Sequence, residues 1–143
     1  IAQKGDLIII DEPELNLHPE NQRKLARLFA MLVNHGIKVF ITTHSDYIIK
    51  ELNILILLNN KTKRLQDLAS RENYKNDELI SSDKIRVYMA KENLIKLEAN
   101  QKKSKCHTLV EVIVSNDQGI ALESFDQTIE EMNRIQDEII WGE

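Results

Sequence analysis

Residues 7–14 read LIIIDEPE. Four large aliphatic side chains in succession, with no polar alternation, predict a strand that is buried on both faces, as in a parallel sheet covered by helices. The strand ends in two adjacent carboxylates, Asp11 and Glu12, and Pro13 follows them. Because open α/β sheets bind ligands at the carboxyl ends of their strands, we expect a functional site at this edge.

The next fifty residues repeat the strand-then-helix pattern. Pro19 is typical of the first position of a helix, and apolar residues then recur at helical spacing up to Val33. Gly36 suits a left-handed cap at the end of this helix. Residues 37–41 predict a second buried strand, and Ser45 or Asp46 is expected to cap a second helix. Strand, helix, strand and helix in this order predict an α/β fold with a parallel sheet.

The remainder of the chain is less regular. Residues 59–83 are polar and predict a loop with one short helix, which makes them the candidate boundary between segments. Residues 85–89 and 108–114 predict antiparallel strands with one wetter face. Ser124 and Gln127 form a capping-box pattern that opens a last helix, with Phe125, Ile129, Met132 and Ile139 on one side. We therefore divide the chain into residues 1–58, 59–83 and 84–143.

Composition sets broad limits on the protein. An apolar content of 42% is sufficient for a buried core, and the single cysteine, Cys106, excludes an intrachain disulfide. No apolar run approaches the length of a membrane span, so we expect a cytoplasmic protein without a membrane partner. Residues 61–105 carry 12 basic and 7 acidic side chains, whereas residues 106–143 carry 1 and 9. A solvated surface is the default interpretation of both segments.

The carboxylates and a histidine suggest phosphate chemistry. Asp11 is expected to hold Mg²⁺, which prefers oxygen ligands, and Glu12 to orient the water that attacks a γ-phosphate. His44 follows the second strand and is expected at the same edge, where an imidazole could contact the γ-phosphate or the water. The alternatives are two carboxylates that only begin a turn and a histidine that is only solvated. The matching strand ends favour the site.

These residues carry a specific resemblance. The DEPE sequence after four aliphatics resembles the Walker B motif of ATP-binding-cassette-type ATPases. Residues 15–19, LNLHP, resemble the D-loop region of those ATPases, and residues 43–45, THS, resemble their H-loop. The sequence of these motifs resembles the RecF/SMC-like and OLD-like soluble branch of the superfamily rather than membrane transporters. This resemblance covers residues 1–58, and a much weaker one covers residues 84–143.

The resemblance implies a fold and a set of roles. The chain would be the C-terminal portion of an ABC-type P-loop NTPase head, followed by a small α+β tail. Asp11 would be the magnesium carboxylate, Glu12 the catalytic base and His44 the γ-phosphate sensor, with ATP and Mg²⁺ as cofactors. Asn16 and Leu17 would lie on the D-loop, which crosses the interface of a head-to-head dimer toward the partner's nucleotide. For His18 we favour a partly exposed helix-entry position over a catalytic role.

The sequence also departs from the family pattern. None of the glycines, at positions 5, 36, 119 and 142, belongs to a G-x-x-x-x-G-K-[ST] phosphate-binding loop. The signature loop expected upstream of Ile1 is missing as well. We therefore expect this chain to be a piece of a longer ATPase, to need the N-terminal lobe of the same protein as a partner, and to be inactive alone.

Three functions remain as alternatives. The first is an ATP-driven, dimerising switch in DNA-linked repair or phage defence, with DNA or an effector nuclease as further partners. The second is the ATPase portion of an OLD-type nuclease, whose Toprim domain requires an Asp-x-Asp pair that this chain lacks. The third is a non-enzymatic interaction piece. Lys102, Lys103 and Lys105 could contact nucleic-acid phosphates, although a solvated loop is the favoured interpretation.

Overall fold

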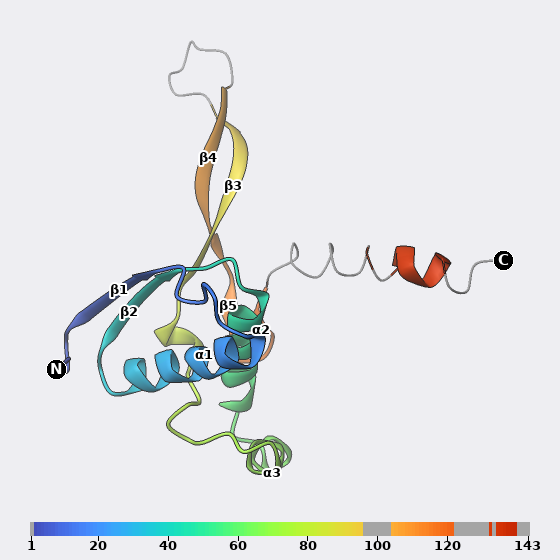
Figure 1. Cartoon of the computed structure of the whole chain (residues 1–143). Helices are drawn as coiled ribbons and strands as arrows, with labels where there is room; N and C mark the ends of the chain where they lie inside the picture. The colour runs from blue at the N-terminus through green and yellow to red at the C-terminus, as the bar shows by residue number, and fades with distance from the viewer. Residues whose placement is uncertain (1, 96–103, 122–131, 133, 140–143) are drawn as a thin grey trace.

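A computed structural model describes residues 2–95, 104–121, 132 and 134–139 of the chain (Figure 1). The elements follow one another in this order: β1 (Leu7–Asp11), α1 (Pro19–Asn34), β2 (Lys38–Thr42), α2 (Asp46–Leu58), α3 (Lys63–Arg71), a 3-10 turn η1 (Ser82–Lys84), β3 (Val87–Ile95), β4 (Ser104–Val112), β5 (Val114–Ser115) and β6 (Gly119–Ile120). The first four elements confirm the predicted strand–helix–strand–helix order. The short helix expected within residues 59–83 is α3.

The two N-terminal strands form a parallel pair. Leu7 lies opposite Lys38, and the register runs without a break to Asp11 opposite Thr42. Helix α1 connects the strands and lies against one side of the pair (Figure 1). The described residues therefore make a small α/β structure with one parallel sheet and two antiparallel ones, as the sequence predicts.

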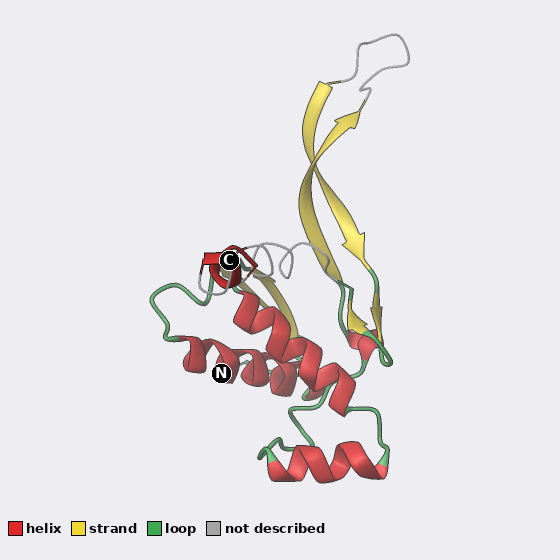
Figure 2. Ribbon diagram, turned by 90° about the vertical axis from the view of Figure 1, so that its right-hand side faces the viewer, coloured by secondary structure: helices red, strands yellow, loops and turns green. Residues whose placement is uncertain are grey.

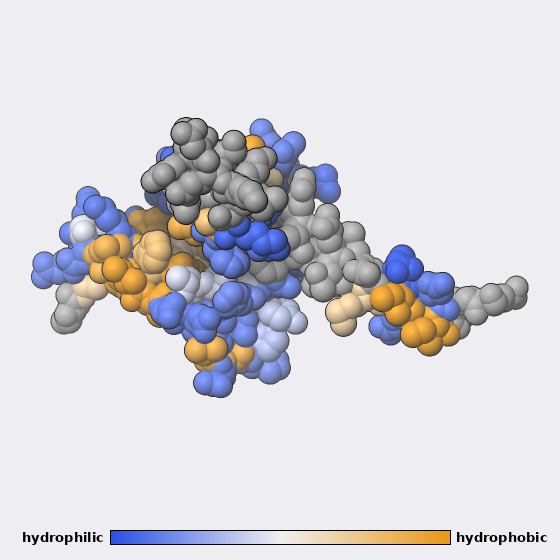
Figure 3. Space-filling model, turned by 90° about the horizontal axis from the view of Figure 1, so that it is seen from above, coloured by the Kyte–Doolittle hydropathy of each residue, from blue (hydrophilic) through white to orange (hydrophobic). Residues whose placement is uncertain are grey.

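The prediction that these strands are buried on both faces is wrong in this structure. Leu7, Ile9 and Phe40 are 57%, 68% and 56% exposed, whereas Ile8 and Ile10 are half-buried. Alternation along each strand sends successive side chains to opposite faces, and within the described part of the chain helices cover one face of the two-stranded sheet (Figure 1). Viewed from above, apolar side chains gather on the side of the molecule where β1 and β2 lie (Figure 3). We call Leu7, Ile9 and Phe40 the open sheet face.

The helix boundaries follow from local capping chemistry. His18 is the N-cap of α1, where its Nδ1 accepts a hydrogen bond from the backbone N–H of Glu20 at 3.4 Å, and Pro19 occupies the first turn. This confirms the helix-entry interpretation of His18. Gly36 follows the helix with a φ of +85°, a left-handed conformation that glycine adopts without strain. Ser45, rather than Asp46, caps α2 by accepting from the backbone N–H of Ile48 at 3.1 Å.

One hydrophobic core joins the three segments of the chain. Its buried members come from α1, α2, residue 80 and the strands near the end of the described region: Ala30, Leu55, Ile56, Ile80, Val112 and Ile120. The core therefore crosses the boundaries expected after residue 58 and before residue 84. Residues 74–80 lie against α1 and α2, which packs the polar segment onto the α/β part.

A buried ion-pair network fixes α1 against α2. The side chain of Glu51 is fully buried, and its two carboxylate oxygens accept from Arg23 Nε at 2.7 Å and Arg27 Nε at 2.6 Å. The Arg27 guanidinium stacks 4.0 Å from the ring centroid of Tyr74, whose hydroxyl accepts from Arg23 at 3.2 Å. Both oxygens of the buried carboxylate are thus neutralised, which offsets the cost of removing that charge from water.

The C-terminal part is dominated by a long hairpin. Strands β3 and β4 pair antiparallel from Val87–Val112 to Ile95–Ser104, as predicted, and the hairpin projects away from α1 and α2 (Figures 1 and 2). The expected capping box at residues 124–127 and the residues Phe125 and Ile129 lie outside the described residues, as do Lys102 and Lys103. Met132 and Ile139 are both helical, and they are 64% and 77% exposed. Among the described helices, none has the length and hydropathy that a bilayer crossing requires.

The Glu51 network yields a stability prediction. Glu51→Gln should lower the free energy of unfolding by about 2 kcal/mol, because the amide offers one acceptor oxygen to two arginine donors and removes the negative charge between them. Glu20→Gln is the matched control: it removes the same charge from the exposed pair that Glu20 makes with Lys24. Urea denaturation of both variants measures the difference. Equal losses from the two substitutions would contradict a structural role for burial at Glu51.

Candidate functional site

The carboxyl ends of β1 and β2 are bonded to each other. Asp11 and Thr42 are the last residues of their strands, and the Thr42 hydroxyl donates to Asp11 Oδ1. The backbone N–H of Glu12 donates to the Thr42 carbonyl at 3.1 Å and lies 3.2 Å from its hydroxyl. The two segments that the sequence singled out are therefore neighbours at one sheet edge, as expected from the parallel topology.

The structure brings Glu12 and His44 into contact. Nε2 of His44 lies 3.4 Å from Oε1 of Glu12. The imidazole is 88% exposed and the Glu12 side chain is 36% exposed, so both groups are accessible from solvent. Asp11 is the last residue of β1, and Glu12 follows it in the turn. This edge of the sheet therefore carries two carboxylates and an imidazole.

The turn after β1 has an unusual backbone. Glu12 has a φ of +45° and Asn16 a φ of +63°, both in the left-handed region. Asparagine tolerates this conformation, but glutamate rarely adopts it, and such residues cluster at functional sites. Two backbone hydrogen bonds close the turn, from Leu15 to the Glu12 carbonyl at 3.1 Å and from Leu17 to the Glu14 carbonyl at 2.9 Å. Glu12, which has the strained backbone in this turn, is thus also the residue that the sequence predicts to be catalytic.

Asn16 and Leu17 lie beside this cluster rather than within it. Asn16 is exposed, and Leu17 is half-buried. The Leu17 carbonyl accepts from Nε2 of Gln22 at 2.8 Å, which ties the end of the turn to the first turns of α1. In the described structure, no hydrogen bond or ion pair joins either residue to Asp11, Glu12 or His44.

Sequence reasoning gave no role to Glu14, which is central to the arrangement. Its Oε1 accepts from the Thr43 hydroxyl and from the backbone N–H of His44, each at 2.7 Å, and the residue is only 8% exposed. Burial raises the pKa of the Glu14 carboxyl, but the hydrogen bonds from Thr43 and His44 outweigh burial and hold the pKa below its usual value. The clue in the sequence is the third carboxylate of DEPE together with the hydroxyls that precede His44.

The described side chains could hold Mg²⁺ only together with ligands from outside this group of residues. Among the described residues, no group of three or more His, Cys, Asp or Glu side chains is placed to hold a metal ion. Mg²⁺ keeps several waters and is often held by one or two carboxylates together with substrate phosphates. An exposed carboxylate such as Asp11, hydrogen-bonded to a threonine hydroxyl, fits that pattern.

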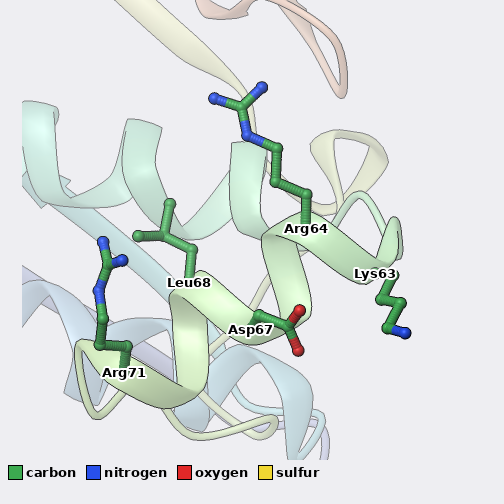
Figure 4. Close-up of a pocket in the computed structure, with 5 residues that line it drawn as sticks. All are labelled: Lys63, Arg64, Asp67, Leu68 and Arg71. Carbon is green, nitrogen blue, oxygen red and sulfur yellow. The ribbon is translucent and has the colours of Figure 1, made fainter.

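A hollow on α3 offers no comparable chemistry. It is lined by Lys63, Arg64, Asp67, Leu68 and Arg71. All five residues come from one helix, and their side chains diverge rather than converge on a point (Figure 4). Arg71 is also paired with the neighbouring Glu72 at 3.1 Å. This surface has the character of a solvated basic helix face.

Comparison with known proteins agrees with the geometry at the strand ends. Residues 1–49 match the family described as the AAA ATPase domain. The matched stretch contains β1, the turn after it, α1, β2 and His44. It therefore includes every residue of the contact between the two strand ends.

A curated relative extends the similarity. The energy-coupling factor transporter ATP-binding protein EcfA of Methanothermobacter thermautotrophicus is 26% identical over 87 residues, which cover 61% of this chain and 28% of that protein. The match thus spans little more than a quarter of the relative's length. No solved structure matches the chain. The two matches support a P-loop ATPase of the ABC or AAA type, and neither distinguishes the RecF/SMC-like and OLD-like branch.

The lowered pKa of Glu14 predicts an acid-sensitive contribution to stability. Because the folded-state pKa lies below the ordinary value of 4.5, ionised Glu14 stabilises the fold above that pH, and this contribution is lost as the pH falls through the folded-state pKa. The difference in unfolding free energy between the wild-type chain and Glu14→Gln should therefore shrink as the pH falls below 4.5. Urea titrations at several pH values measure it. A difference that does not vary with pH would contradict the assignment.

Proposed function

We propose that this chain contributes the Walker B, D-loop and switch-histidine part of an ABC-type ATPase that hydrolyses ATP with Mg²⁺. The observation that carries the proposal is the contact between Glu12 and His44 at the bonded ends of two parallel strands. Open α/β sheets place their ligands at this edge. ATP binding is also the property that the relative's name shares with the AAA ATPase domain matched by residues 1–49.

Asp11 is the proposed magnesium carboxylate. Its side chain is at the exposed strand end, and the Thr42 hydroxyl fixes one of its oxygens, which leaves the other to face a metal or a metal-bound water. When bound, Mg²⁺ neutralises charge on the phosphates. Residue 11 contributes a negative charge and a fixed orientation, while phosphates and water complete the ligand set.

Glu12 and His44 are the proposed catalytic pair. A water between the Glu12 carboxylate and the γ-phosphate would give up a proton to the carboxylate as its oxygen forms the new bond to phosphorus and the bond to the β-phosphate oxygen breaks. Because His44 Nε2 already lies within 3.4 Å of Glu12, the imidazole can donate a hydrogen bond to a γ-phosphate oxygen near the same water. The strained backbone of Glu12 is consistent with such a role.

The turn that carries Asn16 and Leu17 is the proposed dimer contact. Asn16 is exposed and has a left-handed backbone conformation in the turn that precedes α1. By the resemblance to D-loops, this turn would approach the nucleotide of a second head, so that ATP binding brings two heads together and hydrolysis separates them. The resemblance to the RecF/SMC-like and OLD-like branch extends the proposal to DNA-linked repair or phage defence, with DNA or an effector nuclease as partners.

The rest of the ATPase would complete the phosphate site. The sequence has no glycine-rich loop with a Lys-Ser or Lys-Thr pair, so we propose that other segments of the same protein provide the phosphate cradle and that the chain alone is inactive. The open sheet face supports this, because Leu7, Ile9 and Phe40 form an apolar surface that further strands or helices would cover.

The catalytic assignment is tested by Glu12→Gln in the intact ATPase. The amide keeps the shape and the hydrogen-bonding capacity of the side chain, but it cannot accept the proton of the attacking water. We expect ATP hydrolysis to fall by about two orders of magnitude or more while ATP binding stays within threefold. Steady-state phosphate release and equilibrium nucleotide binding measure the two effects.

Two companion variants sharpen this test. Asp11→Asn should weaken Mg²⁺-dependent ATP binding itself, because it removes a metal carboxylate rather than the base. Glu20→Gln changes an exposed glutamate in the first turn of α1 and should leave both properties unchanged. A hydrolysis rate within twofold of wild type for Glu12→Gln would reduce Glu12 to a turn residue.

A further inference from the structure

We propose that Glu14 is a positioning residue that sets the location of His44, and this inference rests on the role proposed above for His44. The backbone of the histidine is held tightly, whereas its imidazole is 88% exposed and touches Glu12. The position of the His44 backbone therefore determines which groups the imidazole can contact. Glu14 makes the most direct connection between that backbone and the turn that carries Glu12.

A single carboxylate oxygen makes this connection. Oε1 of Glu14 accepts from the backbone N–H of His44 and from the Thr43 hydroxyl, each at 2.7 Å. The Thr43 hydroxyl oxygen in turn accepts from the backbone N–H of Ser45 at 3.0 Å. Three consecutive residues around the histidine are thus fixed to a glutamate that is two positions beyond Glu12. Both bonds end on one oxygen, so loss of that oxygen releases the Thr43 hydroxyl and the His44 backbone together.

A second bridge limits how the two turns can move. Gln22 donates from Nε2 to the Leu17 carbonyl at 2.8 Å and accepts from the Ser45 hydroxyl through Oε1. The same Ser45 hydroxyl oxygen caps α2. The turn after β1 and the turn after β2 are therefore joined at Glu14 and again at Gln22. Displacement of one turn must displace the other or break these bonds.

Burial separates the role of Glu14 from the roles of Asp11 and Glu12. Glu14 is 8% exposed, and its Oε2 is buried with no hydrogen-bond partner in the described structure. Its carboxylate faces the Thr43 hydroxyl and the His44 backbone N–H, so it acts on the reaction through His44 and not by contact with nucleotide. Because Oε1 alone makes both bonds, a glutamine can reproduce them, and Glu14→Gln is a matched substitute for the carboxylate.

The first test uses the chain itself and does not require ATP. Amide hydrogen exchange at His44 is compared with exchange at Leu55, a fully buried residue of α2. In Glu14→Ala the ratio of the His44 rate to the Leu55 rate should rise by about tenfold, because the acceptor for the His44 N–H is gone. In Glu14→Gln the ratio should stay within about threefold of wild type. Glu72→Ala, at an exposed glutamate that follows the last residue of α3, is the control and should leave the ratio unchanged.

The second test measures hydrolysis in the intact ATPase. Glu14→Ala should lower kcat by about tenfold with KM within twofold, as expected when a group that contacts the transition state is displaced, and Glu14→Gln should restore most of the rate. Glu14→Asp, which keeps the charge but is one methylene shorter, should resemble Glu14→Ala. If Glu14→Ala fails to fold, Glu14→Asp still tests the positioning role.

The outcomes separate the two proposals. A His44-to-Leu55 ratio that stays within twofold of wild type in Glu14→Ala and Glu14→Asp would overturn the positioning role. Equal losses of kcat in Glu14→Gln and Glu14→Ala would also overturn it, because they would make the charge itself the active feature. A wild-type ATPase that hydrolyses no ATP would refute the proposed function instead, and the exchange ratio would still decide the role of Glu14.

Discussion

The parallel register that sets Asp11 opposite Thr42 is the constraint on which the site depends. It fixes the relative height of two strand ends, and the Thr42 hydroxyl and carbonyl then bind Asp11 and the backbone of Glu12. A slip of one residue would turn every side chain of β2 to the opposite face and separate Thr42 from Asp11. The contact between Glu12 and His44 exists because both residues leave the sheet at the same edge.

Polar contacts then make this edge rigid, since each side of it is tied to a helix. Glu14 and Gln22 join the two turns to each other, and Ser45 joins them to α2. Farther from the edge, Glu51 holds α1 against α2 through Arg23 and Arg27. The apolar core contributes stability but is not directional, whereas these hydrogen bonds fix the relative orientation of the groups that they join. The site thus depends on polar groups that are buried and paired.

Local patterns in the sequence predicted the elements well. The aliphatic runs and helical spacings gave β1, α1, β2 and α2 in the right order, and the capping residues located the helix ends. The topology rule for parallel sheets then predicts that Asp11, Glu12 and His44 share one edge of the sheet. The match of residues 1–49 to an AAA ATPase domain supports the class of protein, an ATPase, but it does not assign a role to each of these residues.

Other features could not be read from the sequence, because they depend on partners distant along the chain. An aliphatic run predicts a strand that prefers burial, but it does not say which face is covered, and Ile9 is 68% exposed. Glu14 accepts hydrogen bonds from residues 29 and 30 positions away, and no local pattern indicates such a bond. The sequence does not predict the burial of Glu51 either, because the other buried residues of its helix are apolar.

The assignment of the nucleotide site is tested best by a structure of the intact protein with a non-hydrolysable ATP analogue and Mg²⁺. This assignment places the metal, or one of its waters, at Asp11, and the γ-phosphate within hydrogen-bonding distance of His44, with Glu12 facing the space between them. Nucleotide bound elsewhere, with Asp11, Glu12 and His44 still open to solvent, would contradict it.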